Sequence, residues 1–229
     1  MGDPPGGALV QRLAMASIPT LRIAYATGNH GKFAEAKHVF NRPENLARAN
    51  VILQQFDVDT VEIQGSKVDI SKHKLKEAAT ILFQEADAGD FDYLLVEDVS
   101  LDLDALNGFP GPYCKPMLEA IGPDGLWDVM SRYEDRNATV TCTVGAMAVR
   151  AGGSRETNVF IGSIRGTMVP PRGEVKHGKA SWNSVFQPAG FAKTFGELQF
   201  VEQAEISHRR IALEKFLGNA IEAATEVNC

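Results

Sequence analysis

The sequence is short of cysteine, of long apolar runs and of positive charge. Its 229 residues include three cysteines, which form no CxxC pair and no Cys/His cluster with zinc-site spacing. Such a scattered set is typical of reduced thiols, so we expect a cytoplasmic protein, with the nucleus as an alternative. No apolar run approaches the roughly eighteen residues of a membrane span. The formal net charge of −6 argues against a protein that follows nucleic-acid phosphates. We therefore expect neither a membrane nor a nucleic acid as partner.

The N-terminal segment does not look like a signal peptide. Asp3 stands where such a peptide carries basic residues, and Gln11 and Arg12 interrupt the apolar stretch. Apolar residues make up 44% of the chain, so the remainder can bury a core without disulfide or metal staples. We expect a disordered N-terminal extension over residues 1–19 and one domain over residues 20–226.

Strand and helix patterns alternate through the first hundred residues. The expected elements are a strand at residues 21–26, a helix around residues 33–40, a strand at 51–58, a helix at 69–86 and a strand at 93–96 that Glu97 and Asp98 end. This alternation is typical of an α/β sheet.

The pattern changes in the second half of the chain. Two β-rich stretches, residues 139–150 and 158–168, flank the Gly-rich segment 151–154, which predicts an antiparallel hairpin. A last amphipathic helix starts near Ser207. The sequence therefore predicts a single mixed α/β domain with two lobes around a cleft.

A glycine-containing turn, Thr27–Lys32, joins the first strand to the first helix. Free backbone N–H groups and the positive end of the helix dipole suit such a turn to phosphate, and Lys32 adds a mobile positive charge. Phe33 stands where a Walker A loop has Ser or Thr, so the turn is not a Walker A loop. For this hexamer alone, a plain glycine-rich turn with a surface lysine is the commoner interpretation.

Two adjacent carboxylates, Glu97 and Asp98, close the apolar strand at residues 93–96. Side chains at the C-terminal end of such a strand face the crevice in which α/β proteins bind ligands. Mg²⁺ takes oxygen ligands, commonly one or two carboxylates together with substrate phosphates, and Glu62 offers a further carboxylate. The alternative is a solvated strand end.

Two further segments carry candidate ligand groups. The proline- and glycine-rich turn at residues 107–113 fixes the backbone ahead of Lys115. Ser207 is a candidate N-cap of the last helix. His208 and Arg209 follow it in the first turn, where the helix dipole disfavours cations, and an anionic or keto-bearing ligand would offset that cost. Taken alone, the turn is equally a tight surface loop, and the Ser-His-Arg triplet is weak evidence.

In combination these motifs are specific. Four of them occur in order between residues 20 and 220: Thr-Gly-Asn-x-x-Lys, Val-Glu-Asp followed by Asp-Ala-Leu-x-Gly-x-Pro-Gly-Pro-Tyr-x-Lys, Trp-x-x-x-Phe-x-Pro-x-Gly, and Ser-His-Arg. The sequence thereby resembles the inosine triphosphate pyrophosphatase (Ham1-like) family. The resemblance implies a mixed α/β fold with an elongated sheet, a homodimer, and a Mg²⁺ cofactor for which Mn²⁺ can substitute. It also implies hydrolysis of non-canonical purine nucleotides (ITP, dITP, XTP) to the monophosphate and pyrophosphate.

The resemblance further implies roles for individual residues. The catalytic groups would be Asp98 and Glu97, and the Mg²⁺ ligands Glu62 and Asp98. The triphosphate would be bound by Thr27, Asn29, Lys32, Lys74 and Lys115. The base would be bound by Trp182, Asn183, Gln203, Ser207, His208 and Arg209.

Several positions depart from the family pattern, most of them in the part that binds the base. Ala180 stands where the family has an aromatic residue that stacks on the base, so Trp182 or Phe186 would have to replace that ring. Asn183 and Gln203 stand where the family has a carboxylate and a lysine.

Two smaller departures accompany these, Ala204 in place of Asn and Val99 in place of Ser or Thr. We expect weaker or different discrimination between inosine and the ordinary purines, with Arg209 still favouring a keto oxygen. The alternatives are a non-catalytic nucleotide-binding paralogue and a pyrophosphatase for a different base.

Overall fold

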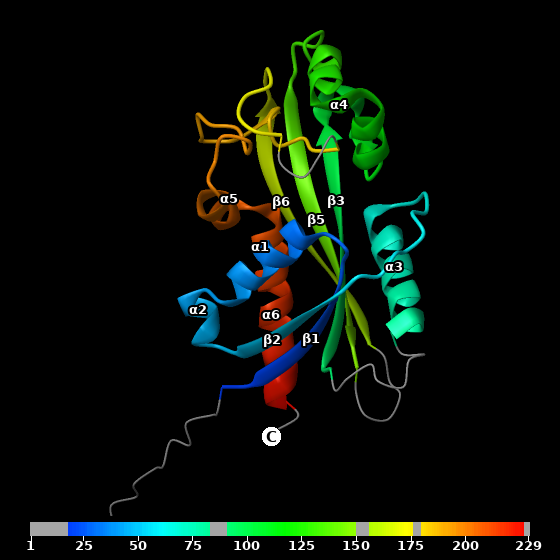
Figure 1. The fold of residues 1–229 in the computed structure, drawn as a ribbon, viewed down its shortest axis with the longest axis vertical. Helices are drawn as coiled ribbons and strands as arrows, with labels where there is room; N and C mark the ends of the chain where they lie inside the picture. The colour runs from blue at the N-terminus through cyan, green and yellow to red at the C-terminus, as the bar shows by residue number, and fades with distance from the viewer. Residues whose placement is uncertain (1–17, 83–90, 150–155, 176–179, 227–229) are drawn as a thin grey trace, which may run out of the picture.

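The computed structural model describes residues 18–82, 91–149, 156–175 and 180–226. Figure 1 shows an elongated molecule in which one long, twisted sheet passes through two lobes. Three predicted segments lie outside the described residues in whole or in part: residues 1–17 of the N-terminal extension, the end of the helix at 69–86, and the hairpin turn at 151–154.

Within the described residues, seven strands form one mixed sheet. They are β1 (Thr20–Ala26), β2 (Asn50–Phe56), β3 (Tyr93–Leu103), β4 (Pro110–Gly111), β5 (Asn137–Ala148), β6 (Thr157–Met168) and β7 (Phe186–Pro188). Their order across the sheet is β2-β1-β3-β5-β6-β7, and β4 pairs with β3. β1 is parallel to β2 and β3, whereas β3–β5, β5–β6 and β6–β7 are antiparallel pairs. The predicted mixed sheet and hairpin are confirmed.

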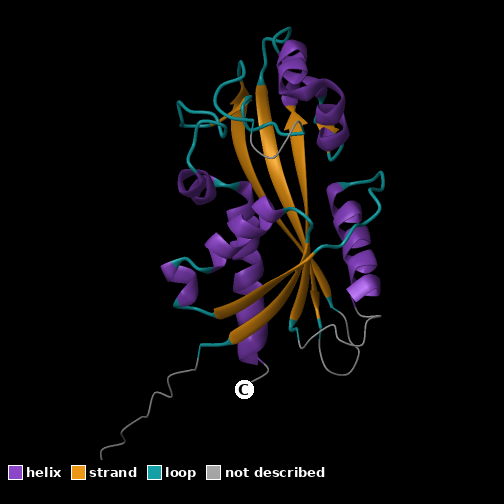
Figure 2. Ribbon diagram, viewed as in Figure 1, coloured by secondary structure: helices purple, strands orange, loops and turns teal. Residues whose placement is uncertain are grey.

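Helices cover both faces of this sheet (Figure 2). They are α1 (His30–Phe40), α2 (Pro43–Leu46), α3 (Lys67–Leu82), α4 (Cys114–Met130), α5 (Phe200–Ile206) and α6 (His208–Glu226). α1 and α6 pack on one face through residues such as Val39 and Phe216. α3 packs on the other face through Leu75 and Ala78, which belong to its predicted apolar stripe. None of the helices in the described part of the chain has the length and apolar character needed to cross a membrane.

A separate core fills the lobe that contains α4. Leu103 of β3 and Val140 of β5 pack there with Leu126 of α4 and with the aromatic side chains of Trp182 and Phe195. β3, β5 and β6 extend from this upper lobe into the lower one, where α1, α3 and α6 cover them (Figure 1). The long strands therefore hold the two lobes in one body.

The prediction that Glu97 and Asp98 end a strand was wrong. β3 continues to Leu103, because β5 pairs with it from Tyr93–Ala148 through Leu103–Ala138. This antiparallel partner supplies backbone hydrogen bonds beyond the two carboxylates, so their charges do not end the strand.

The helix α4 was absent from the sequence-based prediction. Its segment contains prolines and glycines, and Gly122 has a φ of 66°, which separates two helical pieces. Both pieces are nevertheless helical, because Leu118, Leu126 and Met130 bury an apolar side in the upper core. The proline and glycine residues of this segment thus mark a kink between two helical pieces rather than a loop.

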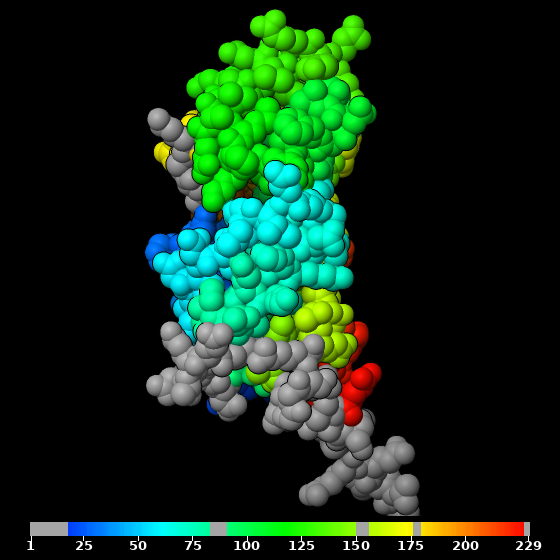
Figure 3. All heavy atoms as spheres, turned by 90° about the vertical axis from the view of Figure 1, so that its right-hand side faces the viewer, coloured from blue at the N-terminus to red at the C-terminus, as the bar shows by residue number. Residues whose placement is uncertain are grey.

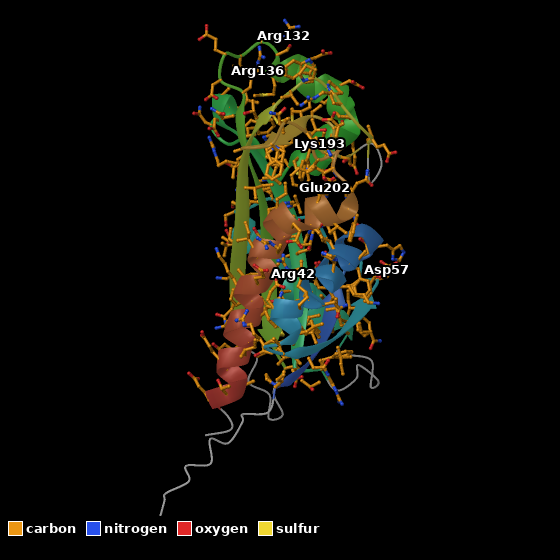
Figure 4. All side chains as sticks on the ribbon, turned by 90° about the vertical axis from the view of Figure 1, so that its left-hand side faces the viewer. Arg42, Asp57, Arg132, Arg136, Lys193 and Glu202 are labelled. Carbon is orange, nitrogen blue, oxygen red and sulfur yellow. The ribbon has the colours of Figure 1, made fainter. Side chains whose placement is uncertain are left out.

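Arg42 forms ion pairs with residues of three helices, α2, α5 and α6. Its Nη1 lies 2.9 Å from Oε2 of Glu205 in α5, and its guanidinium also pairs with Glu44 of α2. Figure 4 shows Arg42 beside α6, and it lies 3.9 Å from Glu214 of that helix. Three helices are therefore linked through one side chain.

β6 and α6 approach so closely at Gly162 that no side chain fits between them. A Cβ at this position would overlap the carbonyl oxygen of His208 and would lie 2.5 Å from the backbone nitrogen of Ala212. Gly162→Ala should therefore lower the free energy of unfolding by about 1–3 kcal/mol or more, through overpacking.

The matched control is Gly218→Ala. The free energy of unfolding of both variants and of the natural protein is measured by urea unfolding at pH 7. The nearest atom to a Cβ there is Nη2 of Arg48 at 3.6 Å, and the site is inside α6. Alanine should raise the stability by about 0.5–1 kcal/mol at such a helical position. Equal effects of the two substitutions would contradict the close approach of β6 and α6.

Candidate active site

A cleft of about 720 Å³ lies between the two lobes. Its walls come from the β1–α1 turn, the segment after β2, β3, the start of α4, and α6. Figure 3 shows α4 (green) above the segment of residues 57–82 (cyan) on one side of the molecule. Every predicted site residue except Ser207 lines the cleft, namely Thr27, Asn29, Lys32, Glu62, Lys74, Glu97, Asp98, Lys115, Trp182, Asn183, Gln203, His208 and Arg209.

The predicted phosphate turn is a capped helix start at the edge of this cleft. Oδ1 of Asn29 accepts the backbone N–H of Lys32 at 3.0 Å and so caps α1. Oγ1 of Thr27 accepts the N–H of Asn29 at 3.1 Å, and the Gln55 amide donates to the Thr27 carbonyl at 2.8 Å. These bonds fix the positive end of the α1 dipole at the cleft.

Two carboxylates meet at a single ammonium group in the cleft. Nζ of Lys74 lies 2.7 Å from Oδ1 of Asp98 and 3.1 Å from Oε1 of Glu62. Burial alone would lower the pKa of Lys74, but the Asp98 carboxylate and then Glu62 hold that pKa above its ordinary value. Lys74 therefore stays charged and brings the two predicted metal ligands together.

Glu62 and Asp98 have the donor chemistry of a magnesium site. Within the described residues, no group of three or more His, Cys, Asp or Glu side chains could hold a metal ion. Mg²⁺ does not need such a cage, because it usually binds one or two carboxylates and completes its shell with water and substrate phosphate. The two carboxylates fit this ion.

Lys115 lies in the opposite wall of the cleft. It is exposed at the start of α4, directly after the turn at residues 107–113. That turn has positive φ at Asn107, Gly108 and Gly111, as expected for a backbone fixed by turn residues. Lys32, Lys74 and Lys115 thus reach one cleft from three different elements.

The adjacent residues Glu97 and Asp98 lie on opposite faces of the sheet. Successive side chains of a strand alternate between its faces. Asp98 faces α3, where Lys74 pairs with it, whereas Glu97 faces α1 and α6. Glu97 therefore has different partners from the Glu62–Asp98 pair, although all three carboxylates line the cleft.

Glu97 is bound on all sides by polar groups. Nε and Nη2 of Arg209 donate to its two oxygens at 2.7 and 2.8 Å, and the Tyr25 hydroxyl donates to Oε2. Nζ of Lys32 lies 3.2 Å from Oε1. Burial alone would raise the pKa of Glu97, but Arg209 and Lys32 outweigh it and hold that pKa far below its ordinary value. Glu97 is thus a buried, fully engaged carboxylate.

Glu35 is a site residue that the sequence analysis missed. It is buried in α1, pairs with Nη1 of Arg209, lines the cleft, and accepts a hydrogen bond from the Ser207 hydroxyl. Glu35 lies four residues before the buried Val39, so helical spacing places it on the inner side of α1. That spacing was the available signal for a buried carboxylate.

Ser207 caps α6 as predicted, because its Oγ accepts the backbone N–H of Arg210 at 3.1 Å. It is fully buried and does not line the cleft. The positive charge of Arg209 is already paired inside the protein. Glu35 and Glu97 offset it, and although burial alone would lower the pKa of Arg209, these carboxylates raise it well above its ordinary value.

Among the other residues that line the cleft, five uncharged ones belong to or flank the predicted base-binding set, and we call them the base end: Ala180, Trp182, Asn183, Gln203 and His208. The Trp182 and His208 rings meet edge to face, with centroids 5.6 Å apart. Burial, and then the Arg209 charge, lower the pKa of His208 to about 3, so the imidazole is neutral.

Of the two rings expected to replace the missing aromatic side chain at position 180, one does not reach the cleft. Phe186 is fully buried in the upper core and does not line the cleft, because its ring packs on Phe195 and Trp182. Trp182 does line the cleft. It is the ring that remains available to a base.

The burial of His208 generates a prediction about acid stability. Its pKa is about 3 in the folded protein and about 6.5 in an unfolded chain, so between these values only the unfolded chain binds the proton. The free energy of unfolding should therefore fall as the pH drops below about 6.5. Between pH 7 and pH 5, the free energy of unfolding of His208→Gln should fall by about 2 kcal/mol less than that of the natural protein. Urea unfolding at the two pH values measures this difference. An equal loss in the two proteins would contradict a neutral, buried imidazole.

Comparison with known sequences agrees with the motifs. The model of the Ham1 family matches residues 23–219. The chain is 37% identical over 195 residues to the inosine triphosphate pyrophosphatase of Yarrowia lipolytica, covering 85% of this chain and 93% of that protein. It is 36% identical over 193 residues to the Schizosaccharomyces pombe protein of the same name, covering 84% of this chain and 92% of that one.

Solved structures agree with the fold. A HAM1 protein from Coxiella burnetii superposes with a TM-score of 0.66 at 22% identity, covering 88% of this chain and 99% of that one. The Staphylococcus aureus Ham1 protein gives a TM-score of 0.65 at 24% identity, covering 87% of this chain and 97% of that one. The order of the motifs, the family match over most of the chain and the shared fold lead to one assignment. The chain belongs to the Ham1 family.

Proposed function

We propose that the protein is a Mg²⁺-dependent nucleoside-triphosphate pyrophosphatase, a hydrolase of acid anhydrides that acts on ITP, dITP and XTP. The observation that carries the proposal is the convergence of Glu62 and Asp98 on Lys74, in a cleft that Lys32 and Lys115 also reach. The relatives named inosine triphosphate pyrophosphatase support it.

The reaction is an in-line attack of water on the α-phosphorus. The new P–O bond forms as the bond from the α-phosphorus to the bridging oxygen breaks, so the monophosphate and pyrophosphate are released. Transfers of this kind need little covalent chemistry from the protein, so positioning and charge neutralisation dominate. Lys32, Lys74 and Lys115 supply positive charge to the triphosphate.

Asp98 is the group that orients the attacking water and accepts its proton. It lines the cleft on the α3 side, whereas Glu97 is held by Arg209, Tyr25 and Lys32. Glu97 therefore acts as a positioning residue, which fixes Lys32 and Arg209. Glu62 and Asp98 would hold Mg²⁺, or Mn²⁺ in its place. The bound ion neutralises charge on the phosphate oxygens.

The same proposal includes a cytoplasmic homodimer, with the nucleus as an alternative compartment. The family resemblance supports the dimer, and the free, buried thiols of Cys114 and Cys142 suit a reducing compartment. Sedimentation velocity that gave only a monomer would contradict the dimer.

The proposed reaction predicts which product leaves. With Mg²⁺, the purified protein should release pyrophosphate, and not orthophosphate, from ITP or XTP, and chelation of the metal should abolish release. Ion chromatography of the products across a panel of nucleoside triphosphates measures this. Orthophosphate alone would point to a different hydrolase. A lack of turnover across the panel would favour a non-catalytic nucleotide-binding paralogue.

The proposed role of Asp98 predicts a large effect of a small substitution. Asp98→Asn should lower kcat by about a hundredfold or more, the order expected when a metal ligand or base is lost. Asp104→Asn is the matched control, because Asp104 pairs with Arg165 on the surface. It should leave kcat within about twofold, as surface substitutions change little. Near-normal turnover of Asp98→Asn would show that the reaction uses other groups.

A further inference from the structure

An ion pair outside the cleft joins two elements that carry or precede its lysines. Nζ of Lys67, in the first turn of α3, donates to Oδ2 of Asp102 in β3. Both side chains are half-buried, with exposed fractions of 28% and 23%. Neither residue lines the cleft. Any effect of this pair on the cleft must therefore pass through the elements that it connects.

Two ion pairs follow one another along the contact between α3 and β3. Lys74 pairs with Asp98, and Lys67 pairs with Asp102. The two lysines are seven residues apart, close to two helical turns, so both lie on one side of α3 and about 10.5 Å apart along it. The two aspartates are four residues apart, so both lie on one face of β3 and about 13 Å apart along it. The similar spacings allow both pairs to form at once and to fix α3 on β3 at two points.

The partner of Lys67 lies in the sheet and not in its own helix. Oγ of Ser66 accepts the backbone N–H of Asp69 at 3.2 Å and so caps the first turn of α3. The helix dipole disfavours a cation in this turn. The carboxylate of Asp102 offsets that cost, so the start of α3 is stabilised where it meets β3.

Asp102 also lies against the turn at residues 107–113, which precedes Lys115. In the sheet it pairs with Pro110 of β4. A Cβ added to Gly111 would lie 3.5 Å from Oδ1 of Asp102, an ordinary contact distance. Figure 1 and Figure 3 both show the start of α3 below α4. One carboxylate thus connects the start of α3 to the turn before α4.

We propose that the Lys67–Asp102 pair sets the separation of Lys74 and Lys115 across the cleft, and thereby the affinity for the pyrophosphate part of the triphosphate. The inference rests on the proposed function, in which both cleft lysines bind the triphosphate. Lys67 and Asp102 are positioning residues, because they hold α3 and the turn before Lys115 without reaching the cleft. Small displacements of binding groups matter, since about 1 Å can cost about a hundredfold.

The two ion pairs differ in what a bound triphosphate does to them. Lys74 shares its ammonium group with Asp98 and Glu62, and in the proposed function it also binds phosphate oxygens, so its partners change. Lys67 and Asp102 lie outside the cleft and keep each other as partners. The outer pair can therefore hold α3 in place while Lys74 turns to the ligand.

Asp102→Asn and Lys67→Gln test the inference, because both break the pair but change the net charge in opposite directions. Long-range electrostatics alone would strengthen the binding of an anion by the first variant and weaken it in the second. Loss of positioning should instead raise the dissociation constant of magnesium pyrophosphate in both, by about threefold to thirtyfold, the range for residues that act on a site from outside it. Calorimetric titration measures these constants.

Two further variants separate the pair from its single members. Lys67→Arg keeps the charge and should keep the dissociation constant within about twofold of the natural value. The double variant Lys67→Gln/Asp102→Asn should bind no more weakly than the weaker single variant, because the pair can be broken only once.

The controls make the same charge changes at a different ion pair. Asp104→Asn and Arg165→Gln break a pair between β6 and the turn after β3, on the surface and away from α3. Each should leave the dissociation constant within about twofold of the natural value. If Asp102→Asn binds as tightly as Asp104→Asn, the inference is wrong. Should Asp102→Asn fail to fold, equal binding by Lys67→Gln and Arg165→Gln would reject it.

The pyrophosphate titration needs no turnover, so it separates this inference from the proposed reaction. The expected constants support the inference even if no triphosphate is hydrolysed. A natural protein that does not bind magnesium pyrophosphate would overturn the inference even if it hydrolyses ITP. In an active protein, KM for ITP should rise in Asp102→Asn by the same factor as the dissociation constant, with kcat within about threefold, because the lost binding is common to the ground and transition states. A fall confined to kcat would contradict the positioning role.

Discussion

Arg209 carries a positive charge into the interior, where a charge is tolerated only when it is paired and hydrogen-bonded. Glu97 from β3 and Glu35 from α1 pair with it, and Tyr25 and Ser207 donate to the same carboxylates. Tyr25 and Glu97 come from the neighbouring strands β1 and β3, and the other three residues come from α1 and the start of α6. The cluster therefore forms only when α1 and α6 are in place on β1 and β3. Breaking one buried pair of this kind costs about 3–5 kcal/mol, because it leaves a charge without its partner. The position of the first turn of α6, and with it one wall of the cleft, depends on this cluster.

The alternation of β3 connects that cluster to the reacting end of the cleft. Glu97 and Asp98 are neighbours in the chain, yet one belongs to the buried cluster and the other pairs with Lys74 on the far face. Any shift of β3 by one residue would exchange the two environments, since the side-chain period of a strand is two. The long pairing with β5 fixes the register and so keeps both carboxylates in their roles. Lys32 contacts Glu97 from the phosphate turn, which gives the triphosphate end and the buried cluster a shared residue.

The two ends of the cleft differ in how their polar groups are held. Lys74 of α3 pairs with Asp98 of β3 and with Glu62 of the segment after β2. At the base end the polar groups are neutral, and Nδ2 of Asn183 and both ring nitrogens of His208 are buried without partners in the described chain. A triphosphate presents only oxygen acceptors, which suit the ammonium group of Lys74.

The sequence by itself determined the local features and the family. The capped helix start at Asn29 and the N-cap at Ser207 follow from short-range hydrogen bonding. Apolar periodicity accounts for the order of the elements through β3, for the β5–β6 hairpin and for α6, but not for α4. Only the tertiary structure decided the length of β3 and the partners of Glu97 and Asp98, because these depend on pairing with β5 and on contacts with α1, α3 and α6. Spacing hinted that Glu35 is buried, but its partners belong to α6 at the other end of the sequence. Helical spacing can place a charged side chain on the inner side of a helix, but it does not identify the distant charge that pairs with it. That pairing depends on the tertiary structure.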